Sequence, residues 1–129
     1  MKIAIATLAA ALIAGAASAQ APAAPASFDP AATSFTGWVR ITDGEFQLYE
    51  NKRQVELPFA RPCVSGALPR GAQRSAHDLN GAQVTFTGQA VPWASRGRAP
   101  VIRHQGSYIR NDCGGPFVIE AQDVRVLGS

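Results

Sequence analysis

The chain has 129 residues with a net charge of +3, and 47% of its residues are hydrophobic. Once a leader and a proline-rich stretch are set aside, about 95 residues remain, which is the length of one domain and excludes a multidomain protein. The two cysteines form no Cys-x-x-Cys motif, so the sequence offers no thiol-exchange site.

Residues 1–19 are predicted to be a secretory signal peptide. Met1-Lys2 gives the positive start, Ile3 to Ala17 is the apolar run, and Ala17-Ser18-Ala19 is a small-x-small cleavage site. A transmembrane anchor is the alternative, but spanning a bilayer takes about 20 apolar residues, and this run is shorter. We therefore expect cleavage between Ala19 and Gln20, export to the periplasm or the cell exterior, and a mature chain without a transmembrane segment.

Residues 20–34 (QAPAAPASFDPAATS) lack periodicity, and their three prolines oppose both helix and ladder hydrogen bonding. This stretch is predicted to be a flexible tether. A single folded domain is expected over residues 35–129.

A disulfide between Cys63 and Cys113 is predicted inside this domain. A domain of this size buries only a modest share of its surface, so a covalent link matters for its stability. In a secreted chain a disulfide is the default state of two cysteines. A zinc site that adds His77 and His104 is the alternative, although the spacing matches no zinc motif. We expect no metal and no cofactor.

The first half of the domain is predicted to be a three-stranded meander. Phe35 to Thr42 and Glu45 to Glu50 are rich in strand-forming residues, and Asp43-Gly44 between them is typical of a tight hairpin turn. Gln54 to Phe59 also alternates and is predicted to be the third strand, placed at an edge by Pro58.

The second half is predicted to hold the central strand. Arg61 to Asn80 does not alternate, and only Gln73 to Leu79 could hold two turns of helix. Ala82 to Val91 then alternates between an apolar and a polar face, as a half-buried strand does. Gly88 falls on the apolar face, which indicates a bulge or the sharp bend of a small barrel.

The remaining chain is predicted to be a long loop, a short extended piece and a last strand. Pro92 to Gly106 has no periodicity and is expected to be an irregular connection, followed by an extended Ser107 to Asn111. Phe117 to Leu127 is the last strand. Its apolar parity changes between Ala121 and Val124, which is typical of a bulge.

In this order, the segments TGWV, GEFQLYE, LNGAQVTFTGQAV and FVIEAQDVRV resemble the OB-fold, a five-stranded Greek-key barrel. The expected fold is all-β: a small five- to six-stranded OB-fold-like barrel with one short helical or irregular connection. A small sandwich would leave a similar pattern. The resemblance implies a ligand lying across strands two and three, between the first-second and fourth-fifth loops. The fold alone names no function.

The sequence offers no catalytic group, and we expect no enzymatic activity. His104, Ser107 and Asp112 are near one another in the chain, but no nucleophile-elbow motif surrounds the serine. Asp43 and Glu45 flank the hairpin turn and are expected to point at water. A periplasmic hydrolase is the third-ranked hypothesis.

The distribution of charge indicates a binding site. Residues from Arg61 to Arg110 include seven arginines against Asp78 alone. Arginine binds carboxylate and phosphate through a planar fork, and aromatic residues between arginines suit an anionic, ring-containing ligand. The candidate residues are Trp93, Arg96, Arg98, Arg103, His104, Tyr108 and Arg110, with Tyr49 and Arg53 at the surface of the sheet. The alternative is a solvated loop that pairs with the acidic strands of its own domain.

The first function hypothesis is a binding module for an anionic or sugar-containing envelope ligand, such as a lipid headgroup or a polysaccharide. Nucleic acid is disfavoured because an exported protein rarely meets it. The second hypothesis is a protein-interaction or structural accessory module that binds an envelope protein and no small molecule. Trp38, Phe59 and Trp93 would then anchor the partner, since aromatic residues often dominate interfaces.

Overall fold

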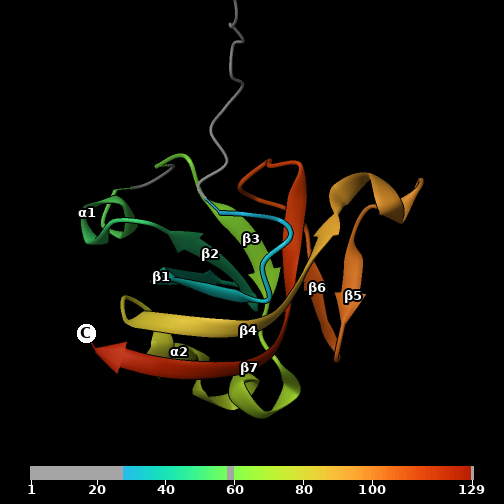
Figure 1. Cartoon of the computed structure of the whole chain (residues 1–129). Helices are drawn as coiled ribbons and strands as arrows, with labels where there is room; N and C mark the ends of the chain where they lie inside the picture. Colours follow the sequence, from blue (N-terminus) through green and yellow to red (C-terminus); the bar gives the residue numbers. More distant parts are fainter. Residues whose placement is uncertain (1–27, 58–59, 129) are drawn as a thin grey trace, which may run out of the picture.

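A closed five-stranded barrel forms the body of the protein (Figure 1). The structure, a computed structural model, describes residues 28–57 and 60–128. The predicted signal peptide and residues 20–27 of the predicted tether lie outside these ranges. The elements in chain order are β1 (Ser34–Thr42), β2 (Glu45–Tyr49), α1 (Lys52–Val55), β3 (Val64–Ala67), η2 (Arg70–Ser75), α2 (Ala76–Leu79), β4 (Gln83–Pro92), η3 (Trp93–Arg96), β5 (Ile102–His104), β6 (Ser107–Ile109) and β7 (Phe117–Gly128), where η denotes a 3₁₀ helix.

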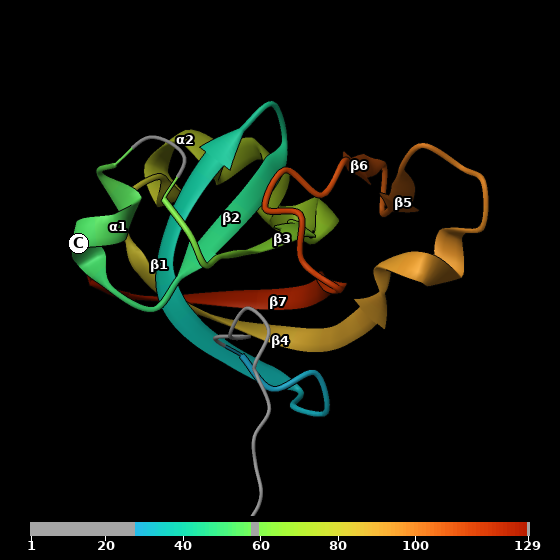
Figure 2. The same ribbon diagram turned by 90° about the horizontal axis from the view of Figure 1, so that it is seen from above.

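The strand order around the barrel is β1-β2-β3-β7-β4, and β4 closes on β1. All neighbours are antiparallel except β3 and β7, which run parallel. The short helices η2 and α2 connect β3 to β4. The predicted all-β, OB-fold-like barrel is thus confirmed. Strands β5 and β6 form a separate two-stranded sheet beside the barrel (Figure 2).

The first hairpin is confirmed with the predicted turn. Asp43 and Gly44 have φ angles of 51° and 86°, the left-handed values that a two-residue hairpin turn requires at both positions. Thr42 and Glu45 are register partners directly beside the turn. The tight turn fixes which side chains of β1 and β2 stand opposite each other.

The prediction of a third strand at Gln54 to Phe59 is wrong. The chain instead forms α1 there, and the third strand is β3, Val64–Ala67; residues 58–59 lie outside the described ranges. The backbone N–H of Asn51 donates to Oε1 of Gln54 at 3.2 Å. An asparagine followed three residues later by glutamine satisfies free N–H groups at a helix start. These hydrogen bonds stabilise the start of the helix. The alternation of residues 54–59 has only three apolar positions, which is too short to outweigh them.

The predicted bulge in the last strand is confirmed. The register of β4 against β7 shifts between Thr87 and Gly88, where Gln122 is the extra residue of β7. A side chain on Gly88 would clash with the carbonyl oxygen of Glu120. Glycine is therefore needed where the two strands bend past each other.

The barrel interior is apolar and closely packed. Phe46 and Phe86 stack at its centre, with their rings 4.0 Å apart and nearly parallel. Phe28 meets Phe35 edge to face at 6.5 Å, so a residue of the predicted tether packs against the barrel. The buried apolar residues around this centre are Val39, Leu48, Val64, Leu68, Leu79, Val84, Phe117 and Ile119.

The prediction that Pro92 to Gly106 is irregular is wrong for much of its length. It contains η3 and β5, and β5 pairs with β6 around a turn at Gln105 and Gly106, with φ angles of 48° and 89°. The predicted extended piece from Ser107 is confirmed as β6. Each strand of this hairpin has three residues, too few for alternation to stand out in the sequence.

The predicted disulfide is confirmed. Cys63 and Cys113 are bonded with their Cα atoms 5.5 Å apart, within the range a disulfide requires. The bond ties the chain entering β3 to the turn before β7, and it removes both cysteines from the alternative zinc site. Within residues 28–57 and 60–128, no helix has the length and hydropathy needed to cross a membrane.

Candidate functional site

The outer faces of β1 and β2 carry a set of polar and aromatic residues in register. Alternation along each strand sends every second side chain away from the barrel core. The resulting cross-strand pairs, from the open end toward the turn, are Trp38 with Tyr49, Arg40 with Gln47, and Thr42 with Glu45. We call this surface, together with the outward residue Ser65 of β3, the outer face.

The outward residues of β2 are buried although they face away from the core. Glu45 is 0%, Gln47 5% and Tyr49 2% exposed. The expectation that Glu45 points at water is therefore wrong, whereas Tyr49 lies on the outer face of the sheet but is buried there. Glu45 is covered by a segment that the sequence did not place over it, residues 110–115, which we call the covering loop.

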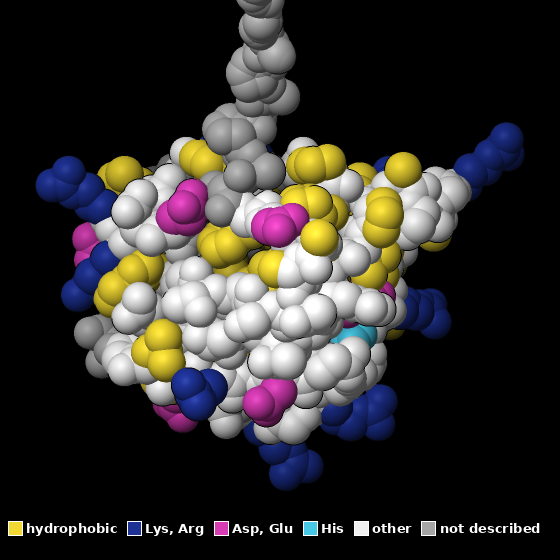
Figure 3. Space-filling model, viewed as in Figure 1, with side chains coloured by type: hydrophobic (Ala, Val, Ile, Leu, Met, Phe, Trp, Pro, Cys, Tyr) yellow, Lys and Arg dark blue, Asp and Glu magenta, His cyan; other side chains and the backbone are white. Residues whose placement is uncertain are grey.

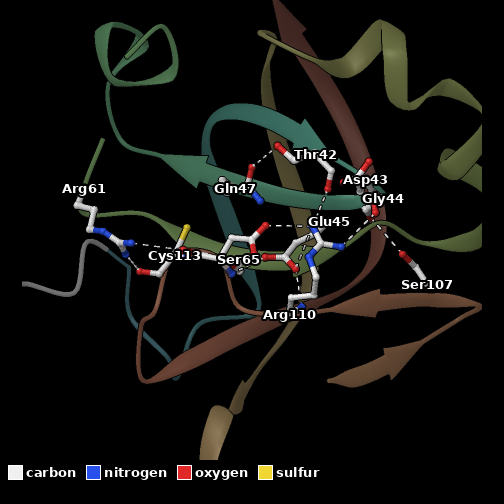
Figure 4. A network of polar contacts seen from close by, with 11 residues as sticks. Thr42, Asp43, Gly44, Glu45, Gln47, Arg61, Ser65, Ser107, Arg110 and Cys113 are labelled. Carbon is white, nitrogen blue, oxygen red and sulfur yellow. Dashed lines mark hydrogen bonds and ion pairs between the residues drawn. The ribbon is translucent and has the colours of Figure 1, made fainter. Parts of the chain in front are cut away.

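The covering loop is fastened to the outer face by its own backbone (Figure 4). The Glu45 carboxylate accepts the backbone N–H of Arg110 at 2.5 Å and that of Asp112 at 2.7 Å. The N–H of Cys113 donates to the Ser65 hydroxyl at 2.9 Å. Because Glu45 is fully buried and hydrogen-bonded through both oxygens, its role is to hold the loop.

Two arginines, Arg61 and Arg110, form hydrogen bonds that hold the covering loop in place. Arg61 donates to the carbonyl oxygens of Cys113 and Asp112. Arg110 donates to the Thr42 carbonyl and to the Asp112 carboxylate, each at 3.0 Å. The hydrogen bond to Asp112 raises the pKa of Arg110 above its ordinary value. Both cations thus direct several of their N–H groups at the protein itself.

A groove of about 400 Å³ lies on the outer face and is bordered by residues 60–63 and by Asp112 of the covering loop. This volume falls within the range of small-molecule sites. Its lining residues are Arg40, Thr42, Gln47, Tyr49, Ala60, Arg61, Cys63 and Asp112. The groove lies over β1 and β2, whereas the OB-fold resemblance implies a ligand across the second and third strands.

Two groups in the groove have unused capacity. Arg40 is half-buried and takes part in none of the ion pairs formed within the described ranges. The Gln47 side chain accepts a hydrogen bond from the Thr42 hydroxyl at 3.3 Å, but its Nε2 donor has no partner. A buried donor without a partner costs about 1–3 kcal/mol. The Nε2 atom itself is covered in this structure, so of these two groups it is Arg40 that can meet a solute in the groove without rearrangement.

Tyr49 supplies a neutral hydroxyl to the groove. Burial raises its pKa above the ordinary value, while the positive charges of Arg40 and Arg61 act in the opposite direction with less effect. Both guanidinium groups therefore lie near enough to the phenol to influence its charge, and the phenol stays protonated at neutral pH.

The loop residues predicted as a binding site are separated and largely occupied. The Arg96 guanidinium stacks 4.0 Å from the Trp93 ring and donates to the Trp93 carbonyl at 2.8 Å. Trp93 itself packs against a small apolar cluster that includes Ile109. Arg103 lies 5.5 Å from the ring of Tyr108, its partner across the β5–β6 hairpin.

His104 has a structural position. It is buried, its Nε2 lies 2.7 Å from the Ala121 carbonyl oxygen, and its Nδ1 lies 4.0 Å from the Glu120 carboxylate. The Ser107 hydroxyl instead donates to the Gly44 carbonyl. His104 thus bonds to β7 and Ser107 to the turn between β1 and β2, and the two side chains do not bond to each other.

The seven arginines between Arg61 and Arg110 do not converge. Only the first and the last of them reach the outer face, Arg98 is exposed beyond η3, and the others lie on η2, η3 and β5. Arg53 is exposed on α1. In Figure 3 the Lys and Arg side chains are spread around the rim of the molecule, without a common patch.

The sequence reasoning missed Arg40, Gln47, Arg61 and Asp112 as site residues. The first two could have been found, because they share the outward parity of their strands and stand opposite each other across the hairpin. Arg61 and Asp112 carried no such signal, since their position depends on the path of the covering loop. Comparisons of the chain with protein-family models, with curated proteins and with solved structures gave no match.

Proposed function

We propose that this protein is a binding module whose groove takes an anionic ligand. The observation that carries the proposal is the Arg40 guanidinium, which lines a groove and has no ion-pair partner within the described ranges. A half-buried cation of this kind favours an anion that replaces lost hydration. Arg61, which lines the same groove, adds a second positive charge.

The preformed wall of the groove supports the proposal. The disulfide, the Glu45 carboxylate and Arg61 all hold the covering loop in place. Binding to a surface that is already ordered loses less conformational entropy, and so leaves more of the contact energy as affinity.

The cell compartment in which the protein acts limits the class of ligand that it can meet. A structural disulfide suits an oxidising compartment, and the sequence of residues 1–19 predicts export. We therefore propose that the protein acts in the periplasm or outside the cell, on an envelope molecule such as an anionic lipid headgroup or polysaccharide. The alternative, a protein-interaction module, has less support because Trp93, one of its three expected anchors, packs against the protein's own strands. Lys52 lies over the ring of Trp38, the second anchor, and Phe59, the third, lies outside the described residues.

The proposal is tested by titrating the ¹⁵N-labelled protein with sodium glucuronate and with inorganic phosphate at low salt. We expect at least one anion to bind, and Arg40→Gln to weaken its binding about tenfold or more, which corresponds to ~1.4 kcal/mol. Arg125→Gln is the matched control, since Arg125 is exposed on β7 and does not line the groove. Unchanged binding by Arg40→Gln, or no binding of either anion, would contradict the proposal.

A further inference from the structure

We infer that the ligand of the groove carries one carboxylate together with hydroxyl groups, as a sugar acid does. This inference rests on the proposed function and adds the chemical class of the ligand. It follows from the charge balance of the groove, from the arrangement of its unused donors, and from the position of one acidic side chain.

The net charge of the groove suits a ligand with one negative charge. Among the residues that line the groove, the charges of Arg40 and Arg61 are opposed by that of Asp112, so the lining has one uncompensated positive charge. A carboxylate neutralises that charge. A phosphate monoester has a charge of about −1.5 to −2 at neutral pH, which would leave an excess of negative charge beside the Asp112 carboxylate.

The unused N–H donors at the groove suit a planar ligand group with two acceptor oxygens. Arg40 and Gln47 are register partners on β1 and β2, and both line the groove. A guanidinium binds the two oxygens of a carboxylate through parallel N–H bonds. The Nε2 atom of Gln47 is covered in this structure, but the terminal torsion of glutamine is broad. Turning the amide toward the ligand would supply a third donor.

The position of Asp112 is the reason why we infer hydroxyl groups on the ligand. Its side chain is 42% exposed and lines the groove, and Oδ2 is bound to Arg110. The other carboxylate oxygen makes no hydrogen bond within residues 28–57 and 60–128. An acceptor at that position favours a ligand hydroxyl and repels a second negative charge. The neutral phenol of Tyr49 can donate to or accept from the same ligand.

The test compares four probes by isothermal titration calorimetry at low salt: glucuronate, glucose 6-phosphate, glucose, and N-acetyl-alanyl-alanine. We expect glucuronate to bind at least about tenfold more tightly than each of the other three. Equal or tighter binding of glucose 6-phosphate would overturn the inference and leave the proposed anion site standing. Equal or tighter binding of the dipeptide would overturn the hydroxyl requirement and indicate a peptide carboxylate. Binding of none of the charged probes would overturn both proposals.

Two variants separate the inference from a general loss of folding. Gln47→Glu places a negative charge against the carboxylate and should abolish glucuronate binding. Asp112→Asn removes the repulsion and should raise the affinity for glucose 6-phosphate relative to glucuronate by several-fold. The second variant tests the inference even if the first fails to fold. An unchanged ratio of the two affinities in Asp112→Asn would contradict the role given to Asp112.

Discussion

Replacing Glu45 with glutamine should loosen the covering loop and destabilise the whole domain. Glu45 is fully buried, and its two oxygens accept the backbone N–H groups of Arg110 and Asp112. The glutamine amide keeps one acceptor and turns the other into a donor. One of the two backbone N–H groups would then face an NH₂ group and lose its partner.

The size of the effect follows from these two bonds. A hydrogen bond to a charged group contributes about 1.5–3 kcal/mol, and a neutral one about 1. Glu45→Gln loses one charged bond and weakens the other, but it also removes the cost of burying a charge. We expect a net destabilisation of about 2–3 kcal/mol, or a fall in Tm of roughly 10–20 °C for a domain of this size.

The assay is urea unfolding of the oxidised protein, followed by circular dichroism, with Glu50→Gln as the matched control. Glu50 is exposed just beyond the other end of β2, so its replacement should change stability by less than about 0.5 kcal/mol. If Glu45→Gln were as stable as the control, the buried carboxylate would not be what holds the covering loop in place.

Three further predictions concern the barrel, the disulfide and pH. Gly88→Ala should destabilise by about 3 kcal/mol or more, because the new Cβ overlaps backbone of β7, whereas Gly71→Ala, with open space around it, should be near neutral in the same unfolding assay. Reducing the disulfide, which closes a 50-residue separation, should lower stability by about 4 kcal/mol on the chain-entropy model, and an unchanged Tm in reductant would refute this. Because the pKa of Tyr49 is raised, the neutral phenol stabilises the fold below pH ~10, and that stability is lost as pH rises through the folded pKa. An absorbance titration in a Tyr108→Phe background should place the Tyr49 midpoint above ~10; a midpoint at or below that value would contradict burial of the ring.

The elements that sequence predicted well are those specified by local chemistry. The Asp43-Gly44 turn needs two left-handed residues, and the parity change before Val124 requires an extra residue in the strand. Both features can be recognised within about ten residues of chain. The third strand was misplaced because the alternation of residues 54–59 competed with a capping pair at Asn51, and capping prevailed.

The candidate site was predicted poorly because it depends on contacts between distant segments. The covering loop reaches β2 through bonds that span more than sixty residues, and no local pattern specifies such a path. Charge density in the sequence pointed to the segment around Arg96, whose cation stacks on its own Trp93. Counting arginines did not reveal which of them line the groove, and that position distinguishes Arg40 and Arg61.

The most direct test of the anion site is a ¹H–¹⁵N map of the resonances that move when glucuronate is added to the full domain. We expect shifts along β1 and β2, with the side-chain signals of Arg40 and Gln47 moving most and the Gln47 NH₂ signals moving downfield as that donor gains a partner. Shifts confined to residues 93–103 would instead place the ligand on the arginine-bearing loop and contradict the groove as the binding site.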